Sequence, residues 1–252
     1  MTMPYYVAPE QAMKDKADFA RKGIARGRSA VVVTFADGVL LCAENPSSTL
    51  RKLAEIYDRI AFAGVGKFNE FDQLRIAGIR HADLKGYSFS REDVDARSLA
   101  NQYAQILGQI FTHEMKPMEV EIVVAEIGDE PTRDQLFHIR YDGTVIDETT
   151  FIVIGGDSET IAERLKATYQ PLASRDEALR IAVRALAGPD RTLPPEELEV
   201  AWLSRTNGRR AFRRLDDEGV RRALEAEPAA PIAASAAAAA PTTEGGGSAP
   251  TQ

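Results

Sequence analysis

The alternation of apolar and polar residues predicts a group of strands near the start of the chain. Residues 29–35 are β-branched and apolar, an Asp-Gly pair follows at 37–38, and residues 39–43 are apolar again. Asp-Gly between two such runs is a strong signal for a tight hairpin turn. Residues 59–64 predict a third strand. Because both faces of these strands are apolar, we expect the sheet to be covered on both sides.

Helical periodicity occurs in pairs of segments that lie between groups of strands. We expect helices at residues 67–78, 95–113, 157–169 and 174–188, and a short one at the end of the folded part. We expect further strands at residues 120–127, 135–141, 150–156 and 198–205. Consecutive strands favour antiparallel sheets, and paired helices favour outer layers. The fold class is therefore α+β, with a four-layer α-β-β-α sandwich as the expected architecture.

The two ends of the chain differ from its middle. The first eight residues have no helical period and hold two tyrosines, which predicts a flexible or conditionally ordered arm over residues 1–8. Pro9 suits the first turn of a helix, which we expect over residues 9–26. Residues 227–252 consist mainly of Ala, Pro, Gly and Ser and cannot build a core, so we expect a disordered tail. One folded domain should span residues 9–226.

Composition narrows the class of protein. The formal net charge of −7 over 252 residues argues against nucleic-acid binding, and the apolar runs are too short to cross a membrane. No signal peptide is visible at the start. Cys42 is the single cysteine, so it cannot form an internal disulfide. Together these features favour a cytoplasmic location.

Candidate chemistry is sparse. Residues 64–67, Gly-Val-Gly-Lys, follow a strand and open a helix, but the glycines are too close and no hydroxyl follows the lysine, so a simple glycine turn is favoured over a phosphate loop. The histidines stand singly, without ligand spacing: His81, His113 and His138. Three carboxylates could serve a site but fit a solvated surface equally well: Asp72, Glu119 and Glu121. We predict no catalytic residue, metal or cofactor.

Several long stretches resemble a known family. Among them are "PEQAMKDKADFARKGIARGRS", "LAEIYDRIAFAGVGKFNEFDQLR" and "RRAFRRL", and the segments "PEQAM" and "KFNEFD" are the most distinctive. They resemble the proteasome family of N-terminal-nucleophile hydrolases, and specifically its α-type members from actinobacteria, over about residues 5–224. The resemblance implies the same four-layer sandwich.

The resemblance also implies a role in protein degradation. It implies a non-catalytic subunit that forms a seven-membered ring with other copies of itself and assembles with β-type subunits of a threonine-type endopeptidase complex. The expected partners also include a hexameric ATPase activator and unfolded protein substrates.

Two sites follow from the resemblance. Lys52 falls where a family lysine receives the terminal carboxylate of the activating ATPase, and Arg51 is its main competitor for that role. The gate that controls access to the pore would be formed by the first residues: Thr2, Met3, Pro4, Tyr5, Tyr6, Val7, Ala8 and Pro9. The stripe of small residues Ala100, Ala104 and Gly108 would lie at a ring interface or in an ordinary helix-on-sheet contact.

Two other functions stay open at this point. A self-processed hydrolase could use Ser29 as its nucleophile, since Ser29 starts the strand on which β-type members carry their catalytic threonine. That chemistry needs a free amine at Ser29, but Arg28 precedes it and a helix lies upstream. The third possibility is a standalone adaptor whose tail recruits partners.

Overall fold

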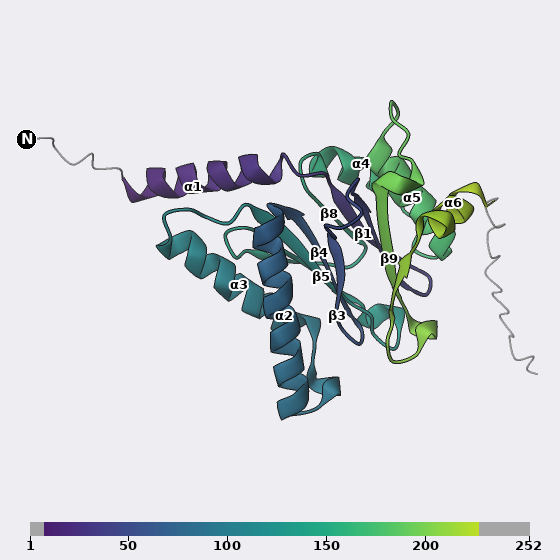
Figure 1. Cartoon of the computed structure of the whole chain (residues 1–252), viewed down its shortest axis with the longest axis horizontal. Coiled ribbons are helices and arrows are strands. Elements are labelled where there is room, and N and C mark those ends of the chain that lie inside the picture. Colours follow the sequence, from purple (N-terminus) through teal and green to yellow (C-terminus); the bar gives the residue numbers. More distant parts are fainter. Residues whose placement is uncertain (1–7, 227–252) are drawn as a thin grey trace, which may run out of the picture.

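The computed structural model of the chain describes residues 8–226, which form four layers, two β-sheets face to face with helices on both outer sides (Figure 1). The helices are α1 (Pro9–Ile24), α2 (Phe68–Ser88), α3 (Ala96–His113), α4 (Ser158–Thr168), α5 (Arg175–Ala187) and α6 (Asp217–Glu225). The strands are β1 (Ala30–Phe35), β2 (Gly38–Glu44), β3 (Leu53–Tyr57), β4 (Ile60–Gly66), β5 (Val120–Glu126), β6 (Gln135–Ile139), β7 (Val145–Glu148), β8 (Phe151–Ile154), β9 (Leu198–Ser204) and β10 (Phe212–Leu215). The predicted α+β sandwich is confirmed.

Each sheet has five antiparallel strands. The first sheet has the order β10-β9-β2-β1-β8, and the second has the order β3-β4-β5-β6-β7. In the first sheet, the predicted hairpin pairs Val31 with Cys42 and closes at Phe35 opposite Gly38. Gly38 is required there, because a Cβ at this position would lie 1.9 Å from the carbonyl oxygen of Leu203 on β9.

The apolar faces of β1 explain why the sheet is covered on both sides. Val31 and Val33 pack in a core with the inner faces of α4 and α5, whereas Val32 packs in the core between the two sheets. Successive side chains of a strand point to opposite faces, so an unbroken apolar run supplies two cores at once. A third core lies between the second sheet and helices α2 and α3, and includes Phe62 and Tyr103.

Helix α2 is ten residues longer at its C-terminal end than the sequence predicts. The prediction ended the helix at Gly78, but α2 continues to Ser88. Gly78 is instead a packing position, because a Cβ there would lie 1.7 Å from the hydroxyl oxygen of Tyr103 on α3. The glycine therefore lets α2 and α3 approach closely, and it is retained despite the cost of glycine inside a helix.

Strands β3 and β7 were not predicted. Both are edge strands of the second sheet, and their apolar residues do not alternate strictly. Three of the four residues of β7 are exposed, so it lacks the apolar signal of a buried strand.

Helix α1 lies along one side of the molecule and carries the N-terminal end away from the sheets (Figure 1). Only its C-terminal half is firmly packed: Ala20 and Ile24 are buried beside Tyr141. The Nε of Arg21 donates to the Tyr141 hydroxyl at 3.1 Å, and the ammonium of Lys16 donates to the carbonyl of Phe111 at 3.0 Å. The predicted helix over 9–26 is confirmed, although it ends two residues earlier.

Candidate functional site

Lys52 lies just before β3, and its half-buried side chain points toward the start of β1. Its ammonium donates to the carbonyl oxygen of Arg28 at 2.6 Å and to that of Glu44 at 3.0 Å. The backbone N–H of Lys52 donates to Glu199 at 2.8 Å. An ammonium has three donors, so these two carbonyls leave one N–H of Lys52 uncommitted.

Two buried carboxylates stand beside this lysine, and each is neutralised by arginine. Glu44 forms ion pairs with Arg28 and with Arg191, the latter at 3.1 Å. Glu199 is 2% exposed and is paired with Arg214. Because buried carboxylates need charged or hydrogen-bonding partners, these contacts fix the ends of β2 and β9 around Lys52.

Burial changes the acidity of Lys52. The surrounding protein lowers the pKa of its ammonium from 10.5 to about 8, chiefly by removing water from it. Glu199 and Glu44 act in the opposite direction, and Arg28 adds slightly to the lowering. Lys52 is therefore a cation near neutral pH, and it carries a donor that an incoming carboxylate could accept.

Ser29 is buried at the junction between α1 and β1. It is 6% exposed, and a Cβ on Gly155 would lie 3.0 Å from its Oγ. Ser29 also lines a small pocket of about 250 Å³ together with Gly27 and Arg28 of the preceding segment. Ser29 is therefore internal to the chain, and the backbone that joins it to α1 lines the same cavity.

The predicted gate falls mostly outside the described residues. Of its eight positions, Thr2, Met3, Pro4, Tyr5, Tyr6 and Val7 lie outside residues 8–226, as does the predicted tail. Ala8 caps α1 and Pro9 occupies its first turn, as expected for proline.

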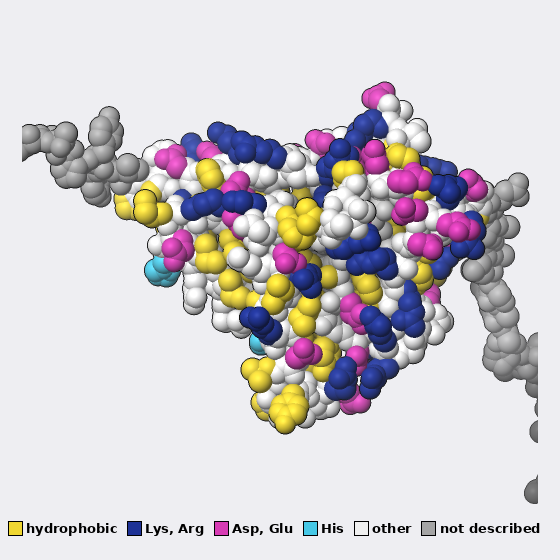
Figure 2. Space-filling view, in the orientation of Figure 1, with side chains coloured by type: hydrophobic (Ala, Val, Ile, Leu, Met, Phe, Trp, Pro, Cys, Tyr) yellow, Lys and Arg dark blue, Asp and Glu magenta, His cyan; other side chains and the backbone are white. Residues whose placement is uncertain are grey.

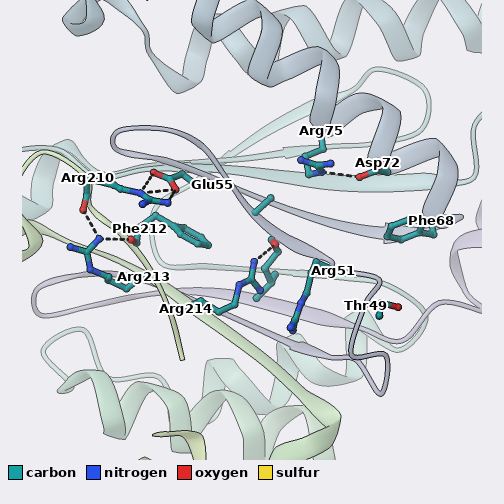
Figure 3. Close-up of a pocket in the computed structure, with 12 residues that line it drawn as sticks. Thr49, Arg51, Glu55, Phe68, Asp72, Arg75, Arg210, Phe212, Arg213 and Arg214 are labelled. Carbon is teal, nitrogen blue, oxygen red and sulfur yellow. Dashed lines mark hydrogen bonds and ion pairs between the residues drawn. The ribbon is translucent and has the colours of Figure 1, made fainter. Parts of the chain in front are cut away.

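Arg51 faces a different region from Lys52. It lines a pocket of about 730 Å³ between β3, β10 and the first half of α2 (Figure 3). Arg51 and Lys52 are adjacent in the sequence, but their side chains lie in two separate sites.

The other candidates are not brought together. Asp72 pairs with Arg75 at 2.8 Å, Glu119 pairs with Lys116 at 3.0 Å, and Glu121 lies 3.8 Å from His138. Among residues 8–226, no group of three or more His, Cys, Asp or Glu side chains could hold a metal ion.

Cys42 and the Gly-Val-Gly-Lys turn have structural roles. Burial raises the pKa of the Cys42 thiol to about 12, with a smaller contribution from Glu199, so the thiol is inert. Gly66 has φ of +110°, and a Cβ there would lie 2.0 Å from the carbonyl oxygen of Glu119. The glycine turn before α2 is confirmed.

The small-residue stripe on α3 is used inside the chain. Gly143, in the turn before β7, sits so close to α3 that a Cβ on it would lie 2.5 Å from the carbonyl oxygen of Ala104 and 2.9 Å from the nitrogen of Gly108. The stripe therefore packs against the turn between β6 and β7 within the chain, and its place at a ring interface stays a prediction.

Sequence reasoning missed Glu44, Glu199 and Arg191, which complete the surroundings of Lys52. The available signal was a charged residue in each of two otherwise apolar strands, "GVLLCAE" and "LEVAWLS". A carboxylate on such a strand is rarely buried without a partner.

The C-terminal half of α2 ends in exposed apolar side chains. Leu84 is 68% exposed, Tyr87 is 92% exposed and Phe89 is 77% exposed. Figure 2 shows hydrophobic side chains gathered at this tip, at the lower end of the molecule in that view. A cluster of this kind marks a contact surface more often than a solvated one.

Two five-stranded sheets stacked face to face between helical layers define a chain of the N-terminal-nucleophile hydrolase fold, in which Ser29 lies inside the chain just before β1. The sequence model of the family described as Proteasome subunit matches residues 24–203. The chain belongs to the proteasome subunit family.

Two similar proteins are both proteasome alpha subunits. The chain is 60% identical to Proteasome subunit alpha of Acidimicrobium ferrooxidans over 228 residues, which is 90% of this chain and 98% of that protein. It is 53% identical to Proteasome subunit alpha of Thermobifida fusca over 228 residues, 89% of this chain and 92% of that one. These similarities place the chain among the proteasome alpha subunits. Such a subunit assembles with other proteasome subunits and takes part in protein degradation.

No helix within residues 8–226 is both long and apolar enough to span a membrane.

Proposed function

We propose that this chain is a non-catalytic ring subunit that controls access of unfolded proteins to a proteolytic chamber. Residues 2–9 form the gate, Lys52 receives the terminal carboxylate of a hexameric ATPase activator, and the cleavage of substrate is carried out by β-type subunits. The ring contains seven copies of the chain.

The observation that carries this proposal is the geometry of Lys52. A lysine on an open surface would hold its ammonium in water, whereas two backbone carbonyls hold this one beside β1 with one donor uncommitted. Charge-assisted hydrogen bonds to a carboxylate are among the stronger polar contacts in proteins. The arginines paired with Glu44 and Glu199 reduce the repulsion that an arriving carboxylate would meet.

The non-catalytic role is supported by the surroundings of Ser29. A hydroxyl nucleophile of this fold uses its own α-amino group as the base, which requires a chain that begins at the nucleophile. The nitrogen of Ser29 is part of the peptide bond to Arg28, and α1 lies upstream of it. The burial of Ser29 adds a steric obstacle to the same chemistry.

The apolar tip of α2 supports assembly with β-type subunits. Leu84, Tyr87 and Phe89 lie on the helical layer of α2 and α3, far from the N-terminal end of α1 (Figure 1). A ring that docks its β-type partners through this layer keeps the arms on another side, where they are free to meet around a pore.

One experiment tests the gate and the catalytic assignment together. The full chain and a variant lacking residues 2–8 are each co-expressed with a β-type subunit, and hydrolysis of a short fluorogenic peptide is measured. We expect the truncated assembly to hydrolyse the peptide several-fold faster, because the closed arms no longer obstruct access. The intact mass of the chain from the same preparation should correspond to a protein that begins at Met1 or Thr2.

Two results would contradict the proposal. Equal rates for the two assemblies would show that residues 2–8 do not form a gate. A chain whose mass corresponds to a start at Ser29 would favour the self-processed hydrolase. A truncation of the tail from residue 230 onward is the matched control, since it shortens the chain at the other end and should leave the rate unchanged.

A further inference from the structure

The pocket beside the β3 edge of the second sheet is lined by more arginines than carboxylates, whereas the β7 edge of the same sheet is acidic. We propose that the pocket at the β3 edge binds the acidic β7 edge of a second copy of this chain, so that successive copies join head to tail. The inference rests on the proposed ring and deepens it, because it names the two surfaces that make the contact.

The basic pocket is the 730 Å³ cavity lined by Arg51, Arg75, Arg210, Arg213 and Arg214, with Glu55 and Asp72 as its carboxylates (Figure 3). Five arginines therefore face two acidic groups. Three of the arginines have carboxylate partners: Arg210 with Glu55, Arg75 with Asp72, and Arg214 with Glu199.

Two cations of the basic pocket lack such a partner. Arg213 donates to the backbone carbonyls of Arg210 and Phe212, at 3.2 and 3.0 Å, and forms no ion pair with residues 8–226. Arg51 is exposed and likewise has no carboxylate partner in that range. The pocket thus presents uncompensated positive charge on a concave surface. The low-dielectric walls of such a surface strengthen the electric field of charges of one sign.

The acidic edge consists of Asp142, Asp147 and Glu148, in β7 and the turn before it. Asp147 and Glu148 are exposed, and within residues 8–226 neither forms an ion pair. Arg140 is the one cation in the same hairpin, so carboxylates outnumber it. Val145, also on β7, is 36% exposed and adds an apolar group to this edge.

The two surfaces of one chain cannot meet each other. They lie at opposite ends of a five-stranded sheet, four strand spacings apart, which is about 19 Å. The proposed pairing of these two surfaces therefore requires a second copy. A contact between two different surfaces of identical chains is heterologous, and it closes into a ring when the rotation between successive copies allows it.

Charge reversal tests this contact. The variants are Asp147→Lys with Glu148→Lys, Arg51→Glu with Arg213→Glu, and the combination of all four, each made in the full chain and co-expressed with a β-type subunit. Sedimentation velocity measures how much of the chain is in ring-sized assemblies. We expect each two-site variant to associate at least about tenfold more weakly, because like charges then face each other across the contact. The four-site variant should recover association, since its two surfaces are again opposite in sign.

Controls separate this effect from net charge and from folding. Glu159→Lys with Glu163→Lys, and Lys166→Glu with Arg184→Glu, make the same changes in charge at exposed positions of α4 and α5, and should assemble like the parent. Circular dichroism and thermal unfolding establish that each variant is folded.

The outcomes are distinguishable. If the parent forms no ring-sized assembly, the proposed ring fails and this inference fails with it. If the parent assembles and both two-site variants do so equally well, or if the folded four-site variant does not recover, this inference alone is wrong. If the Arg51→Glu/Arg213→Glu variant assembles normally but loses binding of a poly-glutamate peptide, the pocket takes an acidic peptide and not a second copy.

Discussion

At the scale of single residues, the state of Lys52 sets when the proposed docking site can work. Its ammonium is half-buried, which explains why its pKa is lowered to about 8. A bound carboxylate would stabilise the charged form and raise that pKa. By linkage, affinity for a carboxylate is then full below pH 8 and decreases as pH rises through 8.

We therefore predict that activator binding weakens between about pH 7 and pH 9 in the parent assembly. The measurement is the binding, across that pH range, of a peptide that carries the activator's C-terminal residues. Lys52→Arg stays charged throughout and should give a flat profile, whereas Lys52→Ala should bind at least about tenfold more weakly at pH 7. A parent profile as flat as that of Lys52→Arg would show that the ammonium is not the receiving group.

At the scale of elements, the contact between α2 and α3 depends on the absence of one side chain. Gly78 faces the hydroxyl of Tyr103, which is fully buried and forms no hydrogen bond with residues 8–226. A buried hydroxyl without a partner costs about 1–3 kcal/mol. The contact between α2 and α3 therefore buries the aromatic ring of Tyr103 but leaves its hydroxyl without a hydrogen bond.

Two substitutions and their combination test this packing by denaturant unfolding. Tyr103→Phe should stabilise the chain by about 1 kcal/mol, because it removes the unpaired hydroxyl. Gly78→Ala should destabilise it by about 1–3 kcal/mol despite the better helix propensity of alanine, because the methyl group overlaps the hydroxyl. The double variant should recover part of that loss, and strictly additive free energies would contradict direct contact.

At the scale of the whole molecule, the three surfaces named in the proposed function lie apart. The apolar tip of α2, the start of β3 beside Lys52 and the N-terminal end of α1 occupy different regions of the sandwich (Figure 1). Contacts at one region need not disturb the others.

Replacing the apolar tip tests this separation. Leu84→Ser, Tyr87→Ser and Phe89→Ser together should leave the melting temperature of the isolated chain within a few degrees of the parent, because all three side chains are exposed. Co-purification with a β-type subunit should fall to background. Serine substitutions at three exposed polar positions of α4, Glu159, Glu163 and Lys166, are the matched control. Retained co-purification in the tip variant would place the β-type contact elsewhere.

The sequence predicted those parts of the fold in which local chemistry and packing agree. Helix α5 starts where Ser174 accepts from the backbone N–H of Glu177 and ends at Gly188, with φ of +69°, both as expected from their residue types. Gly78 led to the wrong end for α2, because a glycine can either end a helix or allow close packing inside one. The sequence alone does not distinguish these two roles. Strand β7 was missed because its exposed residues lack an apolar signal, and β3 was missed because its apolar residues do not alternate with polar ones.

The candidate site was predictable only in part. The resemblance picked out Lys52, but not the carbonyls of Arg28 and Glu44 that hold it, which come from segments 24 and 8 residues away. Glu199 lies still further along the chain, and no local pattern connects it to Lys52. Contacts of this kind arise from the pairing of β2 with β9 and can be seen only in the folded chain.

The hydrogen bond between Arg21 and Tyr141 has a mechanical consequence. Tyr141 follows β6 and opens the turn that leads to β7, and its ring also packs 5.7 Å from that of Phe111 at the end of α3. A second copy seated on the β7 edge, as proposed, would therefore contact the same hairpin that holds the C-terminal half of α1. A displacement of one subunit would then be transmitted through Tyr141 to α1 of the subunit beside it.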